Sequence, residues 1–376
     1  MLPLLALMVT GSAAQAGLVG TVQAVLTQAF LIPGGLIIDR FDRKRLIVLS
    51  GVINAVVLFL LAVLGWSGQL SLGVLLGAAA VFGLTSGWLG EASDALLRSV
   101  VTVERYPQAI TVNEGRDAAL RLAAAPVGGF LLGIATGASL AIAAALQCLS
   151  AILIRPLRVA PTGGEKAQGA LGLMVEAVRW LRHRPRALLL ALLVGAVNFS
   201  VSGVMTTTQF TAVARTGRAL DAGLLTTAAG ISVIVGAIVA GVVIRQIRTG
   251  FVISLTFLWL AVGMAGIAVF NSGAPLVVLL MLTFLGVPAI NAAMAGYFFA
   301  STPESMQGRA QALLATFSVG IGAVAPFLVG LALQGFGPTV AYTVALSPML
   351  VALGVSVFAK RIREIPRPAQ WRDLPL

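Results

Sequence analysis

Long segments without a charged residue constrain this chain most strongly. Seven such segments cover Met1–Ile38, Leu46–Gly90, Leu122–Ile154, Ala187–Ala214, Ala222–Ile244, Thr249–Pro303 and Ala310–Ala359. A helix of roughly 20 apolar residues crosses the core of a bilayer. Only 10% of the 376 residues are charged, against about 25% in soluble domains. The sequence therefore predicts an all-α membrane protein.

Turn signals divide the longer apolar segments into pairs of spans. Examples are "NSGAP" at 271–275 and "QGFGP" at 334–338, since Gly, Pro and Asn clusters mark chain reversals. Eleven spans are expected near 15–38, 46–65, 70–97, 109–135, 138–155, 187–213, 219–244, 250–270, 274–301, 309–333 and 338–359. Residues 1–10 would form about 15 Å of helix. We interpret them as the end of a truncated first span, because a secretory signal would have a basic start and a cleavage site.

Basic residues are distributed unevenly between the two ends of the predicted spans. The net charge is +12, and 21 of the 25 Lys and Arg lie in alternate loops and their flanks. Cytoplasmic loops carry such an excess, so we expect the C-terminus and these loops on the cytoplasmic side of a cell membrane. Residues 361–376 form a basic tail that is expected to face membrane lipids. This distribution does not favour a nucleic-acid partner.

The sequence offers little material for an enzyme or a metal site. Cys148 is the single cysteine and His183 the single histidine, which excludes a disulfide framework and a multi-ligand metal site built on them. We also find no phosphate-binding Gly-Lys-Ser loop and no nucleophile elbow. We therefore expect no catalytic residues, no metal and no cofactor.

The chain divides into two weakly similar halves. We expect an N-terminal helical half at 1–155, a cytoplasmic linker at 156–186, a C-terminal half at 187–360 and the tail at 361–376. Within the linker, "ALGLMVEAVRWLRHRP" has the spacing of an interfacial amphipathic helix, although a plain linker is the alternative. Ala125-Pro126 recurs as Ala325-Pro326, and "GLIIDRFDR" at Gly35 has a weaker copy, "GVVIRQIR", at Gly241. Parallel repeats of this kind occur in secondary transporters.

The segment "GGLIIDRFDRKR" at 34–45 carries six charges in seven positions. It resembles the loop signature of the major facilitator superfamily, Gly-x-x-x-Asp-Arg-x-Gly-Arg-Lys/Arg. The matching residues are Gly35, Asp39, Arg40, Arg43 and Lys44. Asp42 stands at the second Gly, which would allow a turn with φ > 0. The resemblance covers almost the whole chain, and it implies two six-helix halves that work by alternating access.

A second motif resembles the drug and siderophore exporter branch of that superfamily. Proton-coupled exporters carry Gly-Pro-x-x-Gly-Gly in span 5, and this chain has "AAPVGG" at 124–129. Gly128 and Gly129 match, Pro126 is displaced by one position, and Ala124 replaces the leading Gly. The resemblance implies a helix-packing motif at Pro126, Gly128 and Gly129. It also implies a proton-coupled exporter of small amphipathic or lipophilic molecules.

The resemblance further implies a gate at the end of span 2. In the family, the carboxylate at Asp39 faces the N-terminus of span 11, where an anion is favourable. Arg40 and Arg43 can reach carboxylates at the end of span 4. Asp94 and Arg98 share a helix face there, because they lie four residues apart. The alternative is that the basic residues of this loop only set the topology.

Charged residues within spans 4 and 5 are candidates for proton coupling. They are Glu91, Arg116, Asp117 and Arg121. Glu114, Asp117 and Arg121 have the spacing of one helical stripe. Charges inside a membrane normally face a water-filled path or pair with one another. Both a proton relay, in which a desolvated carboxylate is loaded and unloaded, and a static ion-pair network therefore stay open.

Polar residues at mid-membrane are candidates to line a substrate path. They are Ser86, Trp88, Asn198, Gln209, Asn291 and Tyr297. Each of them is alternatively a partner in a hydrogen bond between helices. The middle parts of the C-terminal spans carry no charge, which favours an apolar or amphipathic substrate. The partners expected are therefore a small-molecule substrate, protons and lipids, bound by a monomer.

Two alternative functions stay open at this point. One is an importer or uniporter of a small polar solute, which static ion pairs in spans 4 and 5 would favour. The other is a non-transporting membrane scaffold, which a truly incomplete first span would favour.

Overall fold

The structure is a computed structural model. It describes residues 1–100, 106–156, 179, 182–302 and 307–373. Within these ranges every regular element is a helix, and eight helical stretches, two of which run through two consecutive helices each, are long and apolar enough to cross a membrane. The prediction of an all-α membrane protein is confirmed. Most of the predicted linker at 156–186, including the greater part of its amphipathic helix, lies outside the described residues.

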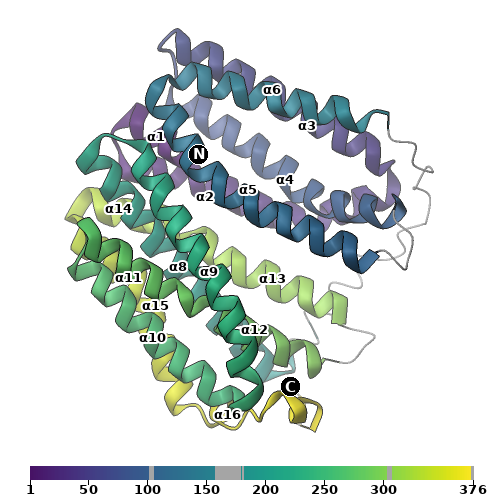
Figure 1. Ribbon diagram of the computed structural model, residues 1–376, viewed down its shortest axis with the longest axis vertical. Coiled ribbons are helices and arrows are strands. Elements are labelled where there is room, and N and C mark those ends of the chain that lie inside the picture. The colour runs from purple at the N-terminus through teal and green to yellow at the C-terminus, as the bar shows by residue number, and fades with distance from the viewer. Residues whose placement is uncertain (101–105, 157–178, 180–181, 303–306, 374–376) are drawn as a thin grey trace. The chain divides into compact units, whose positions relative to one another are not determined.

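The chain forms two compact units (Figure 1). Unit 1 comprises 1–170 and 218–223, and unit 2 comprises 171–217 and 224–376. The helices of unit 1 are α1 (Leu2–Thr10), α2 (Ala13–Arg40), α3 (Arg43–Trp66), α4 (Leu72–Val100), α5 (Tyr106–Ile134) and α6 (Thr136–Ile154). Helix α9 (Ala219–Gln246) begins in unit 1 and continues in unit 2. The other helices of unit 2 are α8 (Pro185–Thr216), α10 (Thr249–Val269), α11 (Gly273–Leu285), α12 (Val287–Ala300), α13 (Gln307–Ala323), α14 (Ala325–Phe336), α15 (Pro338–Phe358), α16 (Lys360–Arg363) and the 3₁₀ helix η2 (Pro368–Asp373).

Two predicted spans are interrupted in the structure. The span expected at 274–301 breaks at Gly286 into α11 and α12, and the span expected at 309–333 breaks at Val324 into α13 and α14. A proline lies in the first turn after each break. Proline has no backbone N–H to continue the helical ladder and its ring clashes with the preceding turn. Pro126, which corresponds to Pro326 in the other half, lies inside an uninterrupted α5. A proline at corresponding positions therefore produces different geometry in the two halves.

Helix pairs in unit 1 approach closely through small residues. Helix α2 packs along α4, and α3 packs along α6 (Figure 1). A methyl group on Gly83 would lie 2.6 Å from the carbonyl oxygen of Gln23, and one on Gly87 would lie 2.7 Å from that of Thr27. Small residues four apart allow such backbone contact between membrane helices. These two glycines therefore set the distance between α2 and α4.

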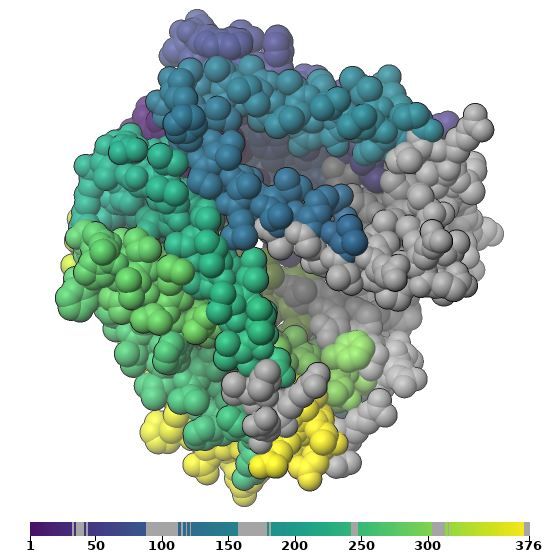
Figure 2. Space-filling view, in the orientation of Figure 1, coloured from purple at the N-terminus to yellow at the C-terminus, as the bar shows by residue number. Residues whose placement is uncertain are grey.

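Helix α8 is central to unit 2, where it packs against α13, α14 and α15. A core of buried apolar side chains extends from α8 to α10 and α15 and includes Phe257, Leu260 and Met349. The outer helix faces are also apolar. In Figure 2 one face of α6 is uncovered, and the exposed residues of that helix include Leu146, Ile152 and Leu153. Apolar side chains on both the inner and the outer face are typical of a multi-pass membrane protein.

Candidate functional site

The charged segment that joins α2 to α3 forms a side-chain cap. Helix α2 ends at Arg40, and Asp42 is the N-cap of α3 with φ −60°. Its Oδ1 atom accepts hydrogen bonds from the backbone N–H of Lys44 at 2.8 Å and of Arg45 at 3.3 Å. Because φ is negative, the turn does not need the glycine of the family pattern. Aspartate suits this position because it satisfies N–H groups that the first turn leaves unpaired.

Lys44 connects this segment to a second helix of unit 1. Its Nζ atom donates a hydrogen bond of 2.6 Å to the carbonyl oxygen of Arg155. Arg155 follows the last residue of α6, where carbonyl groups lack helical partners and attract a cation. The loop is therefore attached to the ends of both α3 and α6.

The side chains predicted to form the gate lie outside those that the structure describes. The predicted gate residues are Asp39, Arg40, Arg43, Asp94 and Arg98, together with Gly35. Their backbones are described, and the glycine contacts pair residue 23 with 83 and 27 with 87. Continued at this offset of 60 residues, the register places the position of Asp39 level with that of residue 99. The helices thus bring the ends of spans 2 and 4 to the same end of unit 1, and the gate itself stays a prediction.

The charged residues of α5 are described only in part. Arg116 donates from Nε and Nη2 to Oδ1 of Asp117, at 3.1 and 2.8 Å. The side chains are 62% and 34% exposed, respectively, so solvent or headgroups reach this pair. The side chains of Glu91, Glu114 and Arg121 lie outside the described set. A role of these residues in proton coupling stays a prediction.

The "AAPVGG" segment of α5 packs against the first turn of α9, which belongs to unit 1. A methyl group on Gly129 would lie 2.6 Å from the carbonyl oxygen of Ala219 and 2.9 Å from Cα of Leu220. From the other side, Gly223 lies against the backbone of Ala125 and Pro126. Gly128 has open space around it. Only the second glycine of the motif is therefore required for close packing here.

Polar side chains of α8 have different surroundings within unit 2. Gln209 donates from Nε2 to Oγ1 of Thr226 at 2.8 Å, which joins α8 to α9. The hydroxyl of Thr208 lies 3.1 Å from that of Tyr342 on α15. Asn198 has its Cβ against Gly322 of α13 and is half-buried. No described group hydrogen-bonds its side-chain amide, and its lining role stays a prediction.

The other predicted path residues are dispersed. Ser86 on α4 and Asn291 on α12 are exposed, and the side chain of Trp88 lies outside the described set. Tyr297 is fully buried, and its ring contacts Trp371 edge to face at a centroid distance of 6.2 Å. A ring covered in this way presents no surface to a solute. This geometry does not support a lining role for Tyr297.

Several structurally important groups were not predicted from the sequence. Gly83 and Gly87 form a small-x-x-x-small pattern that is visible in "FGLTSG". Thr85 donates to Oδ1 of Asn54 at 2.9 Å and joins α4 to α3. Among the described residues, four buried side-chain oxygens have no hydrogen-bond partner, namely Oε1 of Gln28, Oγ of Ser200, Oγ1 of Thr211 and Oγ1 of Thr316. The sequence signal that could have identified Gln28 and Asn54 is an amide side chain within an apolar segment.

Among the described residues, no group of three or more His, Cys, Asp or Glu side chains is placed to hold a metal ion. Cys148 is a free, exposed thiol on α6. His183 hydrogen-bonds through Nδ1 to the carbonyl oxygen of Arg179 at 2.7 Å. The functional groups that the described residues offer are therefore polar side chains between helices and basic side chains at helix ends.

The family comparison matches residues 1–215 to the Major Facilitator Superfamily. The chain belongs to this superfamily. Its members are transporters and not enzymes, and the fold supports secondary transport of small molecules by alternating access. The comparison with curated proteins found no sequence match.

Solved transporters share the fold of this superfamily member at low sequence identity. The nucleoside transporter NupG matches at a TM-score of 0.69 and 15% identity, over 92% of this chain and 90% of NupG. A mutant of NupG gives 0.71 and 14%, with the same coverage. A bacterial homolog of the human lysosomal transporter Spinster, inward-facing and unoccupied, gives 0.68 and 16%, over 96% and 90%. At these identities the likeness concerns the fold alone.

Proposed function

We propose that this transporter is a proton-coupled exporter of small amphipathic molecules. The observation that carries the proposal is the packing at Gly129. The resemblance of "AAPVGG" to the exporter motif implies close helix packing at its glycines, and the backbone of Ala219 leaves no space for a side chain there. This contact supports a packing role for the motif in spite of its displaced proline.

The uncharged surroundings of the Asn198 amide support an amphipathic substrate. Asn198 offers one hydrogen-bonding group on a helix whose other residues are mostly apolar. A ligand site with a few polar groups on apolar walls suits a molecule that is mainly hydrophobic. The exposed Ser86 and Asn291 are further candidates for this path.

The proposed coupling and gating groups are those identified in the sequence. Asp39 and Arg43 are assigned to the gate together with Asp94 and Arg98. Asp117 and Glu91 are assigned to proton loading, with Arg121 and Arg116 as their basic neighbours. The Arg116–Asp117 pair is open to water, as exchange of protons with solvent requires, and the proposed relay needs Asp117 to become desolvated during the transport cycle.

A second candidate function is the movement of an uncharged polar solute. The observation that favours it is the amide of Asn198, since amides hydrogen-bond to neutral polar groups. The nucleoside transporter NupG, whose fold is shared, makes nucleosides a reasonable class to include in a transport assay.

The test reconstitutes the protein in vesicles with an imposed pH gradient. Lipophilic dyes and nucleosides are supplied in parallel, and their movement is followed with and without the gradient. We expect gradient-dependent dye movement that is lost in Asp39→Asn and Asp117→Asn. Gradient-insensitive movement would exclude proton antiport, and movement of nucleosides alone would favour the second candidate.

A matched glycine pair tests the observation on which the proposal rests. In Gly129→Ala the new methyl group meets backbone that cannot yield easily, and overpacking costs about 1–3 kcal/mol. We expect transport to fall about tenfold in this variant. Gly128→Ala is the control, because its methyl group enters open space. Equal activity of the two variants, at equal amounts of folded protein, would remove the support from Gly129.

A further inference from the structure

The C-terminal segment of unit 2 closes over the start of α10. The backbone N–H of Thr249 donates to the carbonyl oxygen of Pro366 at 3.3 Å, and that of Gly250 donates to Ile365 at 3.2 Å. Ile365 is buried, and Nε1 of Trp371 donates to Oγ1 of Thr249 at 2.9 Å. The segment is thus held by backbone, apolar and side-chain contacts together.

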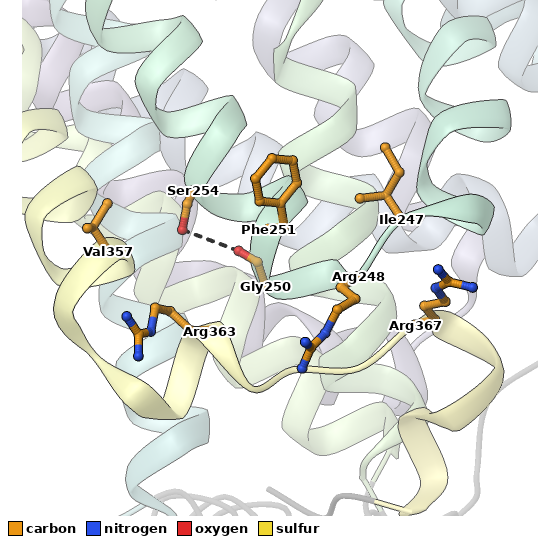
Figure 3. A pocket seen from close by; sticks show the side chains of 8 residues that line it. All are labelled: Ile247, Arg248, Gly250, Phe251, Ser254, Val357, Arg363 and Arg367. Carbon is orange, nitrogen blue, oxygen red and sulfur yellow. Dashed lines mark hydrogen bonds between the residues drawn. The ribbon is translucent and has the colours of Figure 1, made fainter.

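A cavity of about 550 Å³ lies beside this contact (Figure 3). Its basic wall consists of Arg248, Arg363 and Arg367. No described carboxylate forms an ion pair with these guanidinium groups, and the neighbouring Glu364 pairs with Lys360 at 3.7 Å. Three positive charges around one cavity repel one another unless an anion lies between them.

The opposite wall of the cavity is apolar. Figure 3 shows Ile247, Phe251 and Val357 above the three arginines. Phe251 is 59% exposed and Val357 is 42% exposed. Leu255, one turn further along α10, is also exposed. The apolar wall therefore continues along the outer face of α10.

The N-terminus of α10 does not supply the positive end of this site, because the carbonyl groups of Ile365 and Pro366 already occupy its first N–H groups. An anion in the cavity would be held by guanidinium groups, which bind phosphate through paired N–H donors. Inorganic phosphate would use the basic wall only. A phospholipid would use both walls, with its phosphate on the arginines and its acyl chains along Phe251 and Leu255.

We propose that this cavity binds the headgroup of an anionic phospholipid. Basic pockets at the membrane surface attract such headgroups. The bound lipid would neutralise the three arginines and tie α10 to the C-terminal segment. This site is separate from the proposed transport path, so the proposal does not depend on the direction or the substrate of transport.

The test measures lipid binding to the detergent-purified protein by native mass spectrometry. The probes are phosphatidylglycerol, which is anionic, and phosphatidylcholine, which is zwitterionic and has the same acyl chains. The cavity variant carries Arg248→Gln, Arg363→Gln and Arg367→Gln. The control variant carries Arg179→Gln, Arg182→Gln and Arg361→Gln, which remove the same charge from exposed residues that do not line the cavity.

We expect phosphatidylglycerol to bind more tightly than phosphatidylcholine. Arginines near a membrane surface contribute about fivefold each, so the cavity variant should lose more than about tenfold in affinity. The control variant should keep its affinity within about threefold. An equal loss in both variants, or equal binding of the two lipids, would overturn the proposal.

Two further measurements separate the remaining explanations. Soluble glycerol phosphate that binds as tightly as the lipid would overturn the lipid assignment in favour of a phosphate-bearing solute. Should the triple variant fail to fold, the single variant Arg363→Lys keeps the charge but loses the paired donors. We then expect an affinity for phosphatidylglycerol about threefold lower, and an unchanged affinity would overturn the role of the guanidinium group.

Discussion

The two halves of the chain begin equivalent helices in different ways. At an offset of 206 residues, Gly35 corresponds to Gly241 and Asp42 corresponds to Arg248. Both Asp42 and Arg248 are N-cap residues, of α3 and α10 respectively. Asp42 caps its helix with its own carboxylate, whereas Arg248 makes no side-chain cap.

The missing cap in unit 2 is replaced by a distant part of the chain. The carbonyl group of Ile365 accepts the N–H of Gly250, which corresponds to the N–H of Lys44 that Asp42 takes in unit 1, and the carbonyl group of Pro366 accepts the preceding N–H of Thr249. The first N–H groups of any helix need such partners. The comparison shows that a repeat can keep its geometry while the capping group moves from the loop to the C-terminal segment. Four substitutions test this difference, and stability is followed by thermal unfolding in detergent.

The largest effect is expected for Ile365→Ala in unit 2. The side chain is 1% exposed, and truncation of a buried isoleucine costs about 2–5 kcal/mol. The C-terminal segment should detach and leave α10 without its caps. The exposed Gln370→Ala in the same segment should change the unfolding temperature little. Equal stability of both variants would show that this segment does not stabilise α10.

Gly250→Ala should have the next largest effect. Its methyl group would meet the carbonyl oxygens of Ile362 and Arg363, and overpacking costs about 1–3 kcal/mol. Protease cleavage of the C-terminal segment should become faster, because the segment is displaced. Gly241→Ala is the control, since its methyl group enters open space, and its cleavage should stay unchanged.

Asp42→Ala should destabilise α3 by about 1 kcal/mol, the usual cost of losing an N-cap side chain. Asp42→Asn keeps an oxygen that can accept the same hydrogen bonds and should be close to the parent protein. The readout is the unfolding temperature. A large loss in the asparagine variant would instead indicate that the charge of Asp42 matters.

The smallest effect is expected for Arg248→Asp, which gives unit 2 the capping residue of unit 1. The N–H of Gly250 already has a partner in Ile365, so the gain should stay below about 0.5 kcal/mol. Arg248→Gln controls for loss of the positive charge. A stabilisation above about 1 kcal/mol would mean that the C-terminal segment is a poor cap.

Most of the fold was predictable from the apolar segments. The expected spans near 46–65 and 219–244 correspond to α3 and α9, because a crossing helix needs a fixed length of apolar sequence. The breaks at Gly286 and Val324 were not predicted. A proline can interrupt or kink a helix, but the uninterrupted α5 around Pro126 shows that it does not always do so.

The candidate site was predictable only in its residue types. The sequence identified Asn198, Gln209 and Tyr297 as polar residues within spans and could not assign their surroundings. Packing places Asn198 against Gly322, pairs Gln209 with Thr226 and covers Tyr297 with Trp371. The surroundings of these three side chains depend on which helices pack against one another. That packing involves residues that lie far apart in the sequence.

The sequence by itself determined the membrane-spanning helices, the family and the position of the charged loop at 39–45. These properties depend on local composition and spacing, which act without any tertiary contact. Only the tertiary structure decided that Lys44 hydrogen-bonds the end of α6, that Gly129 must be a glycine, and that the basic tail is packed against α10. Each of these depends on a contact between residues that are far apart in the chain, and local hydropathy and spacing do not determine such contacts.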